Sequence, residues 1–171
     1  MILWINGPYG VGKSTLAEAL MEKLPDSFLF DAELVGDAVR ENMPKAFFKE
    51  TYEEYPLWHE LCFCLLKNLA ETYDGHVFVP MTLKQSASVE GILDRLRESG
   101  MSTAHVMLEA DHDTVHDRIL QRGEEEDCWC MQNIFSCQTA QRDLPADLRL
   151  NTADKSPAEL ADEVIQIFNL R

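Results

Sequence analysis

The sequence predicts an α/β protein built as one domain, in which a parallel sheet is covered by helices on both faces. Along its 171 residues, segments of strand character alternate with segments of helical period, which is typical of parallel strands joined by crossover helices. A glycine-rich loop at 7–14 stands between the first strand and the first helix, where such sheets bind ligands. The length suits a single domain spanning 1–171.

The first strand and the first helix frame the glycine-rich loop. The apolar run 2–5 predicts a short strand that enters the loop. Residues 14–24 carry Leu16, Leu20 and Leu24 at helical spacing, which predicts an amphipathic helix.

Two strands and two helices follow. The helix after the second strand should turn Leu34, Ala38 and Val39 inward and end before Pro44, because proline cannot continue a helix. The longer helix should carry one apolar face, formed by Trp58, Leu61, Cys62, Leu65 and Leu69. The four segments are a strand at 27–30, helices at 33–41 and 56–73, and a strand at 76–83.

Capping signals mark the helices in the second half of the chain. Gly100 closes one helix, and Asp111 caps the next. Ser156, Pro157 and Glu159 are typical of the first turn of the last helix. The expected elements are helices at 86–98, 111–121, 131–142 and 156–170, and strands at 104–110 and 148–152.

The charge of the chain excludes some classes of partner. Acids number 30 and bases 15, which gives a net charge of -15. Nucleic acids are bound through basic patches and anionic lipids attract basic segments, so neither a nucleic-acid partner nor membrane association is expected. The apolar N-terminal run ends at Ile5 and has no basic region before it, so a signal peptide is not predicted and a cytoplasmic location is expected.

The stretch GPYGVGKS fits the pattern G-x-x-x-x-G-K-S without a gap. Glycines in this pattern let backbone N–H groups surround phosphate oxygens, and the next helix points its positive end at them. Lys13 should reach the β- and γ-phosphates, and the Ser14 hydroxyl should ligate Mg²⁺. The pattern therefore predicts a nucleotide site. Its expected contacts are Gly7, Pro8, Tyr9, Gly10, Val11, Gly12, Lys13, Ser14 and Thr15.

A carboxylate stands at the exit of the second strand. Asp31 follows 27–30 directly, and ligands of open α/β sheets lie beyond the carboxyl ends of strands. An acid there can orient an acceptor hydroxyl and accept its proton, although Asp31 could instead only cap the next helix. Glu109, at the end of the fourth strand, could ligate a metal or have no chemical role.

Arg118 and Arg122 lie four residues apart and share one helix face. The polar segment that follows could close over a ligand as a lid, at about 118–142. Lid arginines neutralise charge on a transferred phosphoryl group, and Arg142 could add a further cation. The alternative is that Arg118 and Arg122 only pair with acids of their own helix.

The cysteines do not form a familiar metal motif. Cys128 and Cys130 have C-x-C spacing, and Cys137 would add only a third ligand. Reduced thiols without a metal are the expected state.

A set of motifs resembles one family. The chain carries, in this order, WINGPYGVGKS, FDAE, GDAVR, YPLW, VPMT and RILQR. These are similar to the tunicamycin-resistance ATP-binding proteins of bacteria, whose wider relatives are small P-loop kinases such as chloramphenicol phosphotransferase, shikimate kinase and gluconate kinase. The resemblance runs over about 1–140, and YPLW and VPMT are its more specific marks because many families share the loop.

This resemblance implies a three-layer P-loop NTPase fold whose five parallel strands have the order 2-3-1-4-5. It implies ATP with Mg²⁺ in the loop, Asp31 as catalytic base beside Lys13, and Arg118 and Arg122 as lid arginines. The segment after the last strand, Asn151 and Thr152, would line the adenine. Tunicamycin, an amphipathic acylated nucleoside, suits a pocket with apolar and aromatic walls. The expected substrate contacts are Glu33, Arg40, Tyr55, Trp58 and Thr82.

Three functions remain open on the sequence. The first is an ATP-dependent small-molecule phosphotransferase that confers resistance to tunicamycin or a related nucleoside antibiotic. The second is a protein that sequesters the drug in an ATP-dependent way without phosphorylating it. The third is a kinase for a nucleoside or sugar metabolite. All three need the phosphate loop, so the loop does not separate them.

Overall fold

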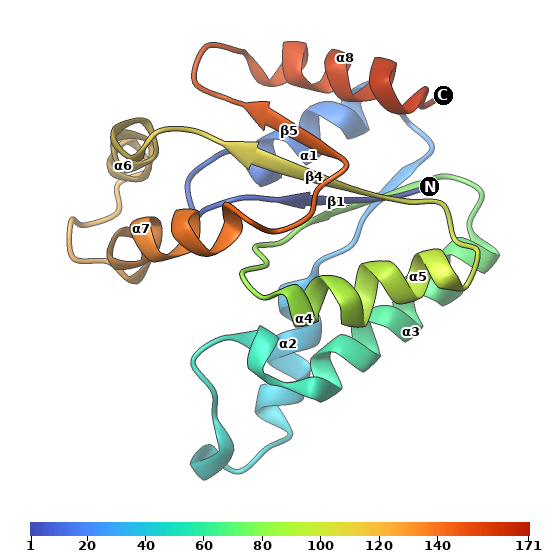
Figure 1. Cartoon of the computed structure of the whole chain (residues 1–171), viewed down its shortest axis with the longest axis horizontal. Coiled ribbons are helices and arrows are strands. Elements are labelled where there is room, and N and C mark those ends of the chain that lie inside the picture. The colour runs from blue at the N-terminus through green and yellow to red at the C-terminus, as the bar shows by residue number, and fades with distance from the viewer.

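The sheet has five parallel strands in the order β2-β3-β1-β4-β5. The computed structural model describes every residue from Met1 to Arg171. The predicted three-layer architecture and strand order are confirmed (Figure 1). The strands are β1 (Ile2–Asn6), β2 (Ser27–Leu29), β3 (His76–Pro80), β4 (Thr103–Glu109) and β5 (Leu148–Asn151).

Helices cover both faces of the sheet and one of its ends (Figure 1). The helical elements are α1 (Lys13–Lys23), α2 (Ala32–Glu41), η1 (Lys45–Phe47), η2 (Tyr52–Glu54), α3 (Pro56–Thr72), α4 (Ser86–Ser88), η3 (Val89–Asp94), α5 (Arg95–Glu98), α6 (His112–Gln121), α7 (Trp129–Gln141) and α8 (Pro157–Phe168). α1 and α8 cover one face, and α2, α3 and the run from α4 to α5 cover the other. α6 and α7 lie at the end to which β4 and β5 point, where ligands bind in open parallel sheets. None of the helices combines the length and the apolar composition that crossing a bilayer requires.

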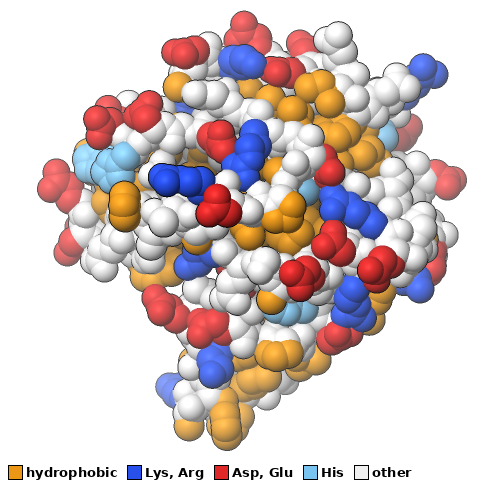
Figure 2. All heavy atoms as spheres, in the orientation of Figure 1, with side chains coloured by type: hydrophobic (Ala, Val, Ile, Leu, Met, Phe, Trp, Pro, Cys, Tyr) orange, Lys and Arg blue, Asp and Glu red, His pale blue; other side chains and the backbone are white.

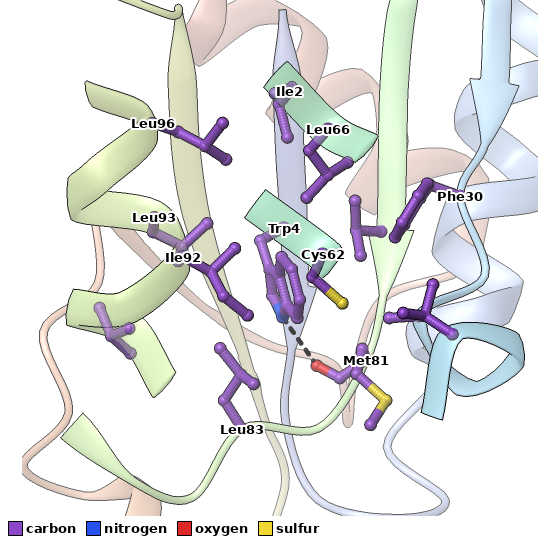
Figure 3. Close-up of a cluster of buried hydrophobic side chains, with 14 of the residues drawn as sticks. Ile2, Trp4, Phe30, Cys62, Leu66, Met81, Leu83, Ile92, Leu93 and Leu96 are labelled. Atoms are coloured by element: carbon purple, nitrogen blue, oxygen red, sulfur yellow. Dashed lines mark hydrogen bonds between the residues drawn. The ribbon is translucent and has the colours of Figure 1, made fainter. Parts of the chain in front are cut away.

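The sheet separates two apolar cores because alternate residues of a strand point to opposite faces. Trp4 of β1 lies in the core under α3 and η3, where its indole N–H donates to the carbonyl oxygen of Met81 at 3.0 Å (Figure 3). Leu3 and Ile5 point the other way, into the core shared with α1 and α8. β1 is thus buried on both faces, and the glycine-rich loop that follows it starts from a fixed base.

Several predicted helix ends are confirmed by their caps. The Asp111 carboxylate caps α6 by accepting a backbone N–H, and Ser156 with Glu159 forms a capping box at the start of α8. Gly100, with φ +81°, follows the end of α5. The predicted helix 86–98 is one continuous helical run, although its middle, η3, has π-helical hydrogen bonds.

Two predicted apolar faces are wrong in part. On α2, Leu34 and Ala38 are exposed, and Val35 is buried. On α3, Leu65 is exposed and the neighbouring Leu66 lies in the core. Adjacent positions are about 100° apart around a helix. Where apolar residues occupy both positions, the period alone does not say which of them faces the sheet.

Candidate active site

The glycine-rich loop curves around open space between β1 and α1. Gly7, Gly10 and Gly12 have φ of +145°, +81° and +110°, which side chains disfavour. A Cβ on Gly7 would lie 2.7 Å from the carbonyl oxygen of Leu108, so only glycine lets the loop pass this close to β4. A Cβ on Gly12 would meet no protein atom within 4 Å. The loop therefore has the hollow form in which backbone N–H groups surround a phosphate.

Lys13 is the first residue of α1 and turns its ammonium group back into the loop. Its Nζ donates to the carbonyl oxygens of Gly7 at 3.0 Å and Pro8 at 2.9 Å, and lies 5.5 Å from the centre of the Tyr9 ring. Burial lowers the pKa of Lys13 to about 8, because loss of solvent disfavours the charged form. A phosphate anion would supply the countercharge that this buried ammonium lacks.

Three adjoining pockets surround the loop. The central pocket lies over it and contains Lys13 and Ser14. The α8-side pocket lies between the loop and the start of α8, and shares Gly10 and Arg122 with the central pocket. The α2-side pocket lies between the loop and α2. It shares Tyr9, Glu33 and Thr82 with the central pocket. A single elongated ligand, or two ligands end to end, can therefore extend through all three.

Bases gather around the central and α8-side pockets. Lys13, Arg118, Arg122 and Lys155 line them, against only two acids. The chain as a whole has twice as many acids as bases. This local reversal of charge favours an anionic ligand over the loop.

Arg118 is fixed in the wall of the α8-side pocket. Its guanidinium donates to the Thr152 hydroxyl at 2.8 Å, to the Thr152 carbonyl oxygen at 2.7 Å and to the Val11 carbonyl oxygen at 3.2 Å. Thr152 is buried and also lines this pocket. Asn151 is exposed, and its side chain accepts the backbone N–H of Ala153 instead. Arg118 thus holds the loop to the end of β5, away from the central pocket.

Arg122 caps the C-terminus of α6 and lines both the α8-side and the central pocket. It is exposed, and no carboxylate pairs with it or with Arg118. Arg118 and Arg122 both line the α8-side pocket, although Arg122 follows the last residue of α6. Of the two arginines, only Arg122 also reaches the central pocket.

The two acids after β2 occupy different positions. The Asp31 carboxylate caps α2 by accepting the N–H of Glu33 at 2.9 Å and of Leu34 at 3.3 Å. Glu33 lines both the central and the α2-side pocket. Its pKa is raised, first by burial and then by the charge of Asp31. Asp31 therefore has the helix-capping role that was its alternative, and Glu33 is the acid that lines the central pocket.

The α2-side pocket has aromatic and acidic walls. Its volume of 340 Å³ is in the range of small-molecule sites. Arg40 is its only base, and the guanidinium lies 4.7 Å from the centre of the Tyr52 ring. Trp129, at the start of α7, packs edge to face on Tyr9 of the loop, with ring centroids 4.9 Å apart. Glu50 and Glu53 add two acids to that of Glu33.

An apolar corner adjoins this pocket. Apolar side chains gather at the lower tip of the molecule in Figure 2, where η1 lies in Figure 1. Phe47 and Phe48 there are 65% and 43% exposed. The Phe48 ring lies 5.9 Å from the guanidinium carbon of Arg40, which places this corner next to the pocket wall.

Two predicted substrate contacts lie in the core instead. Trp58 is fully buried and its indole N–H donates to the Ala32 carbonyl oxygen. Tyr55 is 3% exposed, and its hydroxyl accepts the N–H of Lys49 at 2.6 Å. Of the aromatic residues of YPLW, Trp58 is thus bonded to the start of α2, and Tyr55 to the segment after η1. Arg40 and Thr82 do line the α2-side pocket.

The remaining candidates lie outside the three pockets or at their edge. Glu109 pairs with Arg149 of β5, and no group of three metal-ligating side chains exists in the chain. Burial raises the pKa of the Cys137 thiol to about 11 and keeps it protonated. In the predicted lid, α6 ends at Gln121 and α7 begins at Trp129, so only the polar segment between them lacks regular helix.

Sequence reasoning missed Trp129 and Glu53. The Glu53 carboxylate is buried and accepts the N–H groups of Lys84 and Gln85 and the hydroxyl of Ser88, which ties η2 to the loop after β3. The signal T-Y-E-E at 51–54, a capping box, could have revealed the turn that places Glu53. Nothing local in the sequence brings Trp129 to Tyr9.

Comparison with known proteins places the chain in a family and supports the fold. A family model described as an AAA domain matches residues 2–134. The tunicamycin resistance protein of Deinococcus radiodurans is 28% identical, with a TM-score of 0.82 over 99% of this chain and 96% of that chain. This confirms the resemblance to that family and the kinship to P-loop proteins.

Two kinases share the fold. Shikimate kinase from Bacteroides thetaiotaomicron is 20% identical, with a TM-score of 0.63 over 99% of both chains. A gluconokinase from Sinorhizobium meliloti is 18% identical, with a TM-score of 0.64 over 96% of this chain and 89% of that chain. At such identity the likeness shows the fold alone. None of the curated proteins compared with the chain matches it.

Proposed function

The chain belongs to the AAA-domain family of P-loop proteins, and on this premise we propose that it transfers the γ-phosphoryl group of ATP to a hydroxyl of a small molecule. We propose tunicamycin or a related nucleoside antibiotic as the acceptor, so that the protein confers resistance to it. The observation that carries the proposal is the row of three pockets: one basic and flanked by Arg118, one over the phosphate loop, and one with aromatic walls.

In this arrangement the base of ATP lies in the α8-side pocket against Arg118 and Thr152. The phosphates lie over the loop, where backbone N–H groups and Lys13 hold them. The Ser14 hydroxyl, beside Lys13 in the central pocket, fits the role of a Mg²⁺ ligand. Bound Mg²⁺ would neutralise charge on the β- and γ-phosphates.

The acceptor lies in the α2-side pocket with one hydroxyl toward Glu33 and Thr82. Its oxygen forms a bond to the γ-phosphorus, and the bond from that phosphorus to the bridging oxygen of the β-phosphate breaks, so that ADP leaves. The acceptor proton passes to a carboxylate at the exit of β2. Glu33 is the better placed acid for this step, because it lines both pockets and Asp31 is engaged in capping α2. Arg122 neutralises charge on the transferred group from the far side.

Mass spectrometry of tunicamycin after incubation with the protein and Mg-ATP tests the proposal. Phosphoryl transfer predicts a product heavier by one phosphate, and the same incubation with Lys13→Ala should yield none. Drug that stays unmodified while cells expressing the protein are protected would instead establish ATP-dependent sequestration. Unmodified drug without protection would leave another metabolite as the acceptor.

A further inference from the structure

A buried amide lies directly beneath the phosphate loop. Asn6, the last residue of β1, is fully buried. Its side-chain oxygen accepts three N–H groups: the backbone of Gly7 at 2.7 Å, the backbone of Leu83 at 2.8 Å, and the Gln141 amide at 3.0 Å. Asn6 therefore joins the first residue of the loop to the exit of β3 and to α7.

The orientation of the Asn6 amide is fixed by its partners. Backbone N–H groups can only donate, so the oxygen must face Gly7 and Leu83. The Asn6 nitrogen donates to the Leu83 carbonyl oxygen at 3.2 Å and lies 3.1 Å from Nε2 of His105 on β4. Burial lowers the pKa of His105 to about 4, so at neutral pH its Nε2 is uncharged and accepts this bond. Every polar atom of Asn6 is thus engaged.

Gln141 is the link from this amide to α7. It is the last residue of the helix and is 3% exposed. Its amide nitrogen donates both to Asn6 and, at 3.0 Å, to the Leu83 carbonyl oxygen. At the other end of α7, Trp129 packs on Tyr9 of the loop and lines the α2-side pocket. One end of this helix of about 20 Å is therefore bonded to the residue that precedes the phosphate loop, and the other end packs on Tyr9 within the loop.

We propose that Gln141 is a positioning residue for catalysis. It holds the C-terminus of α7 on Asn6, so that the loop over the phosphates and the Trp129 wall of the α2-side pocket keep one relative geometry. α7 then keeps its position within the lid region, and only the segment between Arg122 and Cys128 closes over the bound ligand. The kinetic test of this role rests on the proposed function, whereas a test by hydrogen exchange does not.

One substitution separates positioning from folding. Gln141→Met keeps the length of the side chain and removes the amide. Asn6 and the Leu83 carbonyl oxygen keep their bonds to each other, and no buried protein donor loses its only partner. The side-chain oxygen Oε1 of Gln141, buried without a partner, is removed as well. Because both acceptors of the Gln141 amide keep other donors, no buried polar group is left unsatisfied and stability should change little.

Gln138→Met is the matched control. Gln138 lies one turn earlier on α7, and its amide donates to the Ala110 carbonyl oxygen at 3.0 Å, away from Asn6. We expect kcat for ADP release from Mg-ATP with tunicamycin to fall about tenfold or more in Gln141→Met, since small misplacements of reacting groups cost up to about 100-fold. The KM for ATP and the melting temperature should stay close to those of the control.

Hydrogen exchange of residues 7–13 gives the second readout. The amides of this segment should exchange faster in Gln141→Met than in Gln138→Met. This difference is expected whether or not the wild-type protein turns over ATP. Equal exchange and equal kcat in the two variants would overturn the proposal. So would a loss of kcat that is matched by a fall in melting temperature, because the amide would then only stabilise the fold. A wild type without turnover removes the proposed function, and the exchange comparison still decides the role of Gln141.

Discussion

The α8-side and α2-side pockets flank the same loop, but they differ in charge and in construction. The α8-side pocket and the central pocket together carry four bases and two acids. The α2-side pocket carries one base, Arg40, against Glu33, Glu50 and Glu53. The first pair of pockets is suited to an anion. The second is suited to a ligand of little negative charge with apolar parts.

The two sides also differ in where their residues come from. The phosphate side depends on one contiguous loop, whose backbone and Lys13 make most of the contacts expected for a nucleotide. The α2-side pocket is assembled from α2, the η2 region, the exit of β3 and the start of α7. The difference teaches that one contiguous loop and its lysine can recognise a phosphate, whereas an acceptor needs side chains gathered from several elements of the fold. Predictions on each side can separate the two roles.

The largest effect should follow removal of the Lys13 ammonium. Lys13→Ala should abolish phosphoryl transfer, a loss of more than about 10³ in kcat/KM, because the phosphates lose their central cation. The melting temperature should hold, since Lys13 contributes charge and not core packing. Steady-state kinetics measure kcat/KM, circular dichroism measures the melting temperature, and calorimetry with Mg-ATP measures the nucleotide affinity. Equal nucleotide affinity in wild type and variant would break the assignment of the phosphate side.

The two arginines of α6 should differ in kind. Arg122→Ala should lower kcat by about 10³ with a smaller effect on ATP affinity, because a lid arginine acts on charge that develops during transfer. Arg118→Ala should mainly weaken ATP binding, because its guanidinium holds Thr152 and Val11 in the α8-side pocket. Steady-state kinetics with titrated ATP separate kcat from KM. A wild-type kcat in Arg122→Ala, or an unchanged KM for ATP in Arg118→Ala, would contradict the role given to that arginine.

The acids after β2 test the border between the two sides. Glu33→Gln should lower kcat by about 10² or more, the usual contribution of a general base, and leave ATP affinity nearly unchanged. Asp31→Asn should retain the helix cap, because asparagine caps as well as aspartate does. If Asp31→Asn loses more kcat than Glu33→Gln, Asp31 is the base that the family resemblance implies. Full drug resistance in cells with either variant, and no phosphorylated drug, would favour sequestration.

Local signals predicted the loop and the elements on either side of it. The loop, the strand before it and the helix after it are contiguous, so Gly7, Lys13 and Ser14 could be placed from spacing alone. The strand order came from the family resemblance and the caps from single residues such as Ser156. These features depend on short-range chemistry, which a sequence displays directly.

The α2-side pocket could not be predicted in the same way. Tyr55 and Trp58 are aromatic residues near the pocket in sequence, yet they lie in the core, Tyr55 just before α3 and Trp58 on the face of α3 that turns inward. The sequence does not predict a role for Trp129, because only the packing of α7 brings this side chain to Tyr9. The Asn6–Gln141 contact joins residues 135 positions apart. Such contacts follow from the packing of whole elements, which local pattern does not encode.

The smallest expected effect is a pH dependence confined to the phosphate side. In the folded protein burial lowers the pKa of Lys13 to about 8, against 10.5 ordinarily. Below pH 8 Lys13 is charged and binds phosphate. Between pH 7 and pH 9 the charged fraction of free protein falls about tenfold, so ATP affinity should fall by up to the same factor.

The sign for stability is opposite, and this makes the test specific. The folded state binds the Lys13 proton less tightly than the unfolded state, so the cost of burying the charge is fully present below the folded pKa of about 8. That cost is relieved as pH rises from about 8 toward 10.5, and Lys13 alone then makes folding more favourable while ATP binding weakens.

Calorimetric titration of Mg-ATP at pH 7, 8 and 9 measures the affinity. Lys13→Arg is the control, because arginine stays charged throughout and its affinity should be flat over this range. An equal decline in Lys13→Arg would assign the pH dependence to another group. Tyr9 and Cys130 of the same pocket are not expected to be that group, because burial raises the pKa of each above its ordinary value and so above this range.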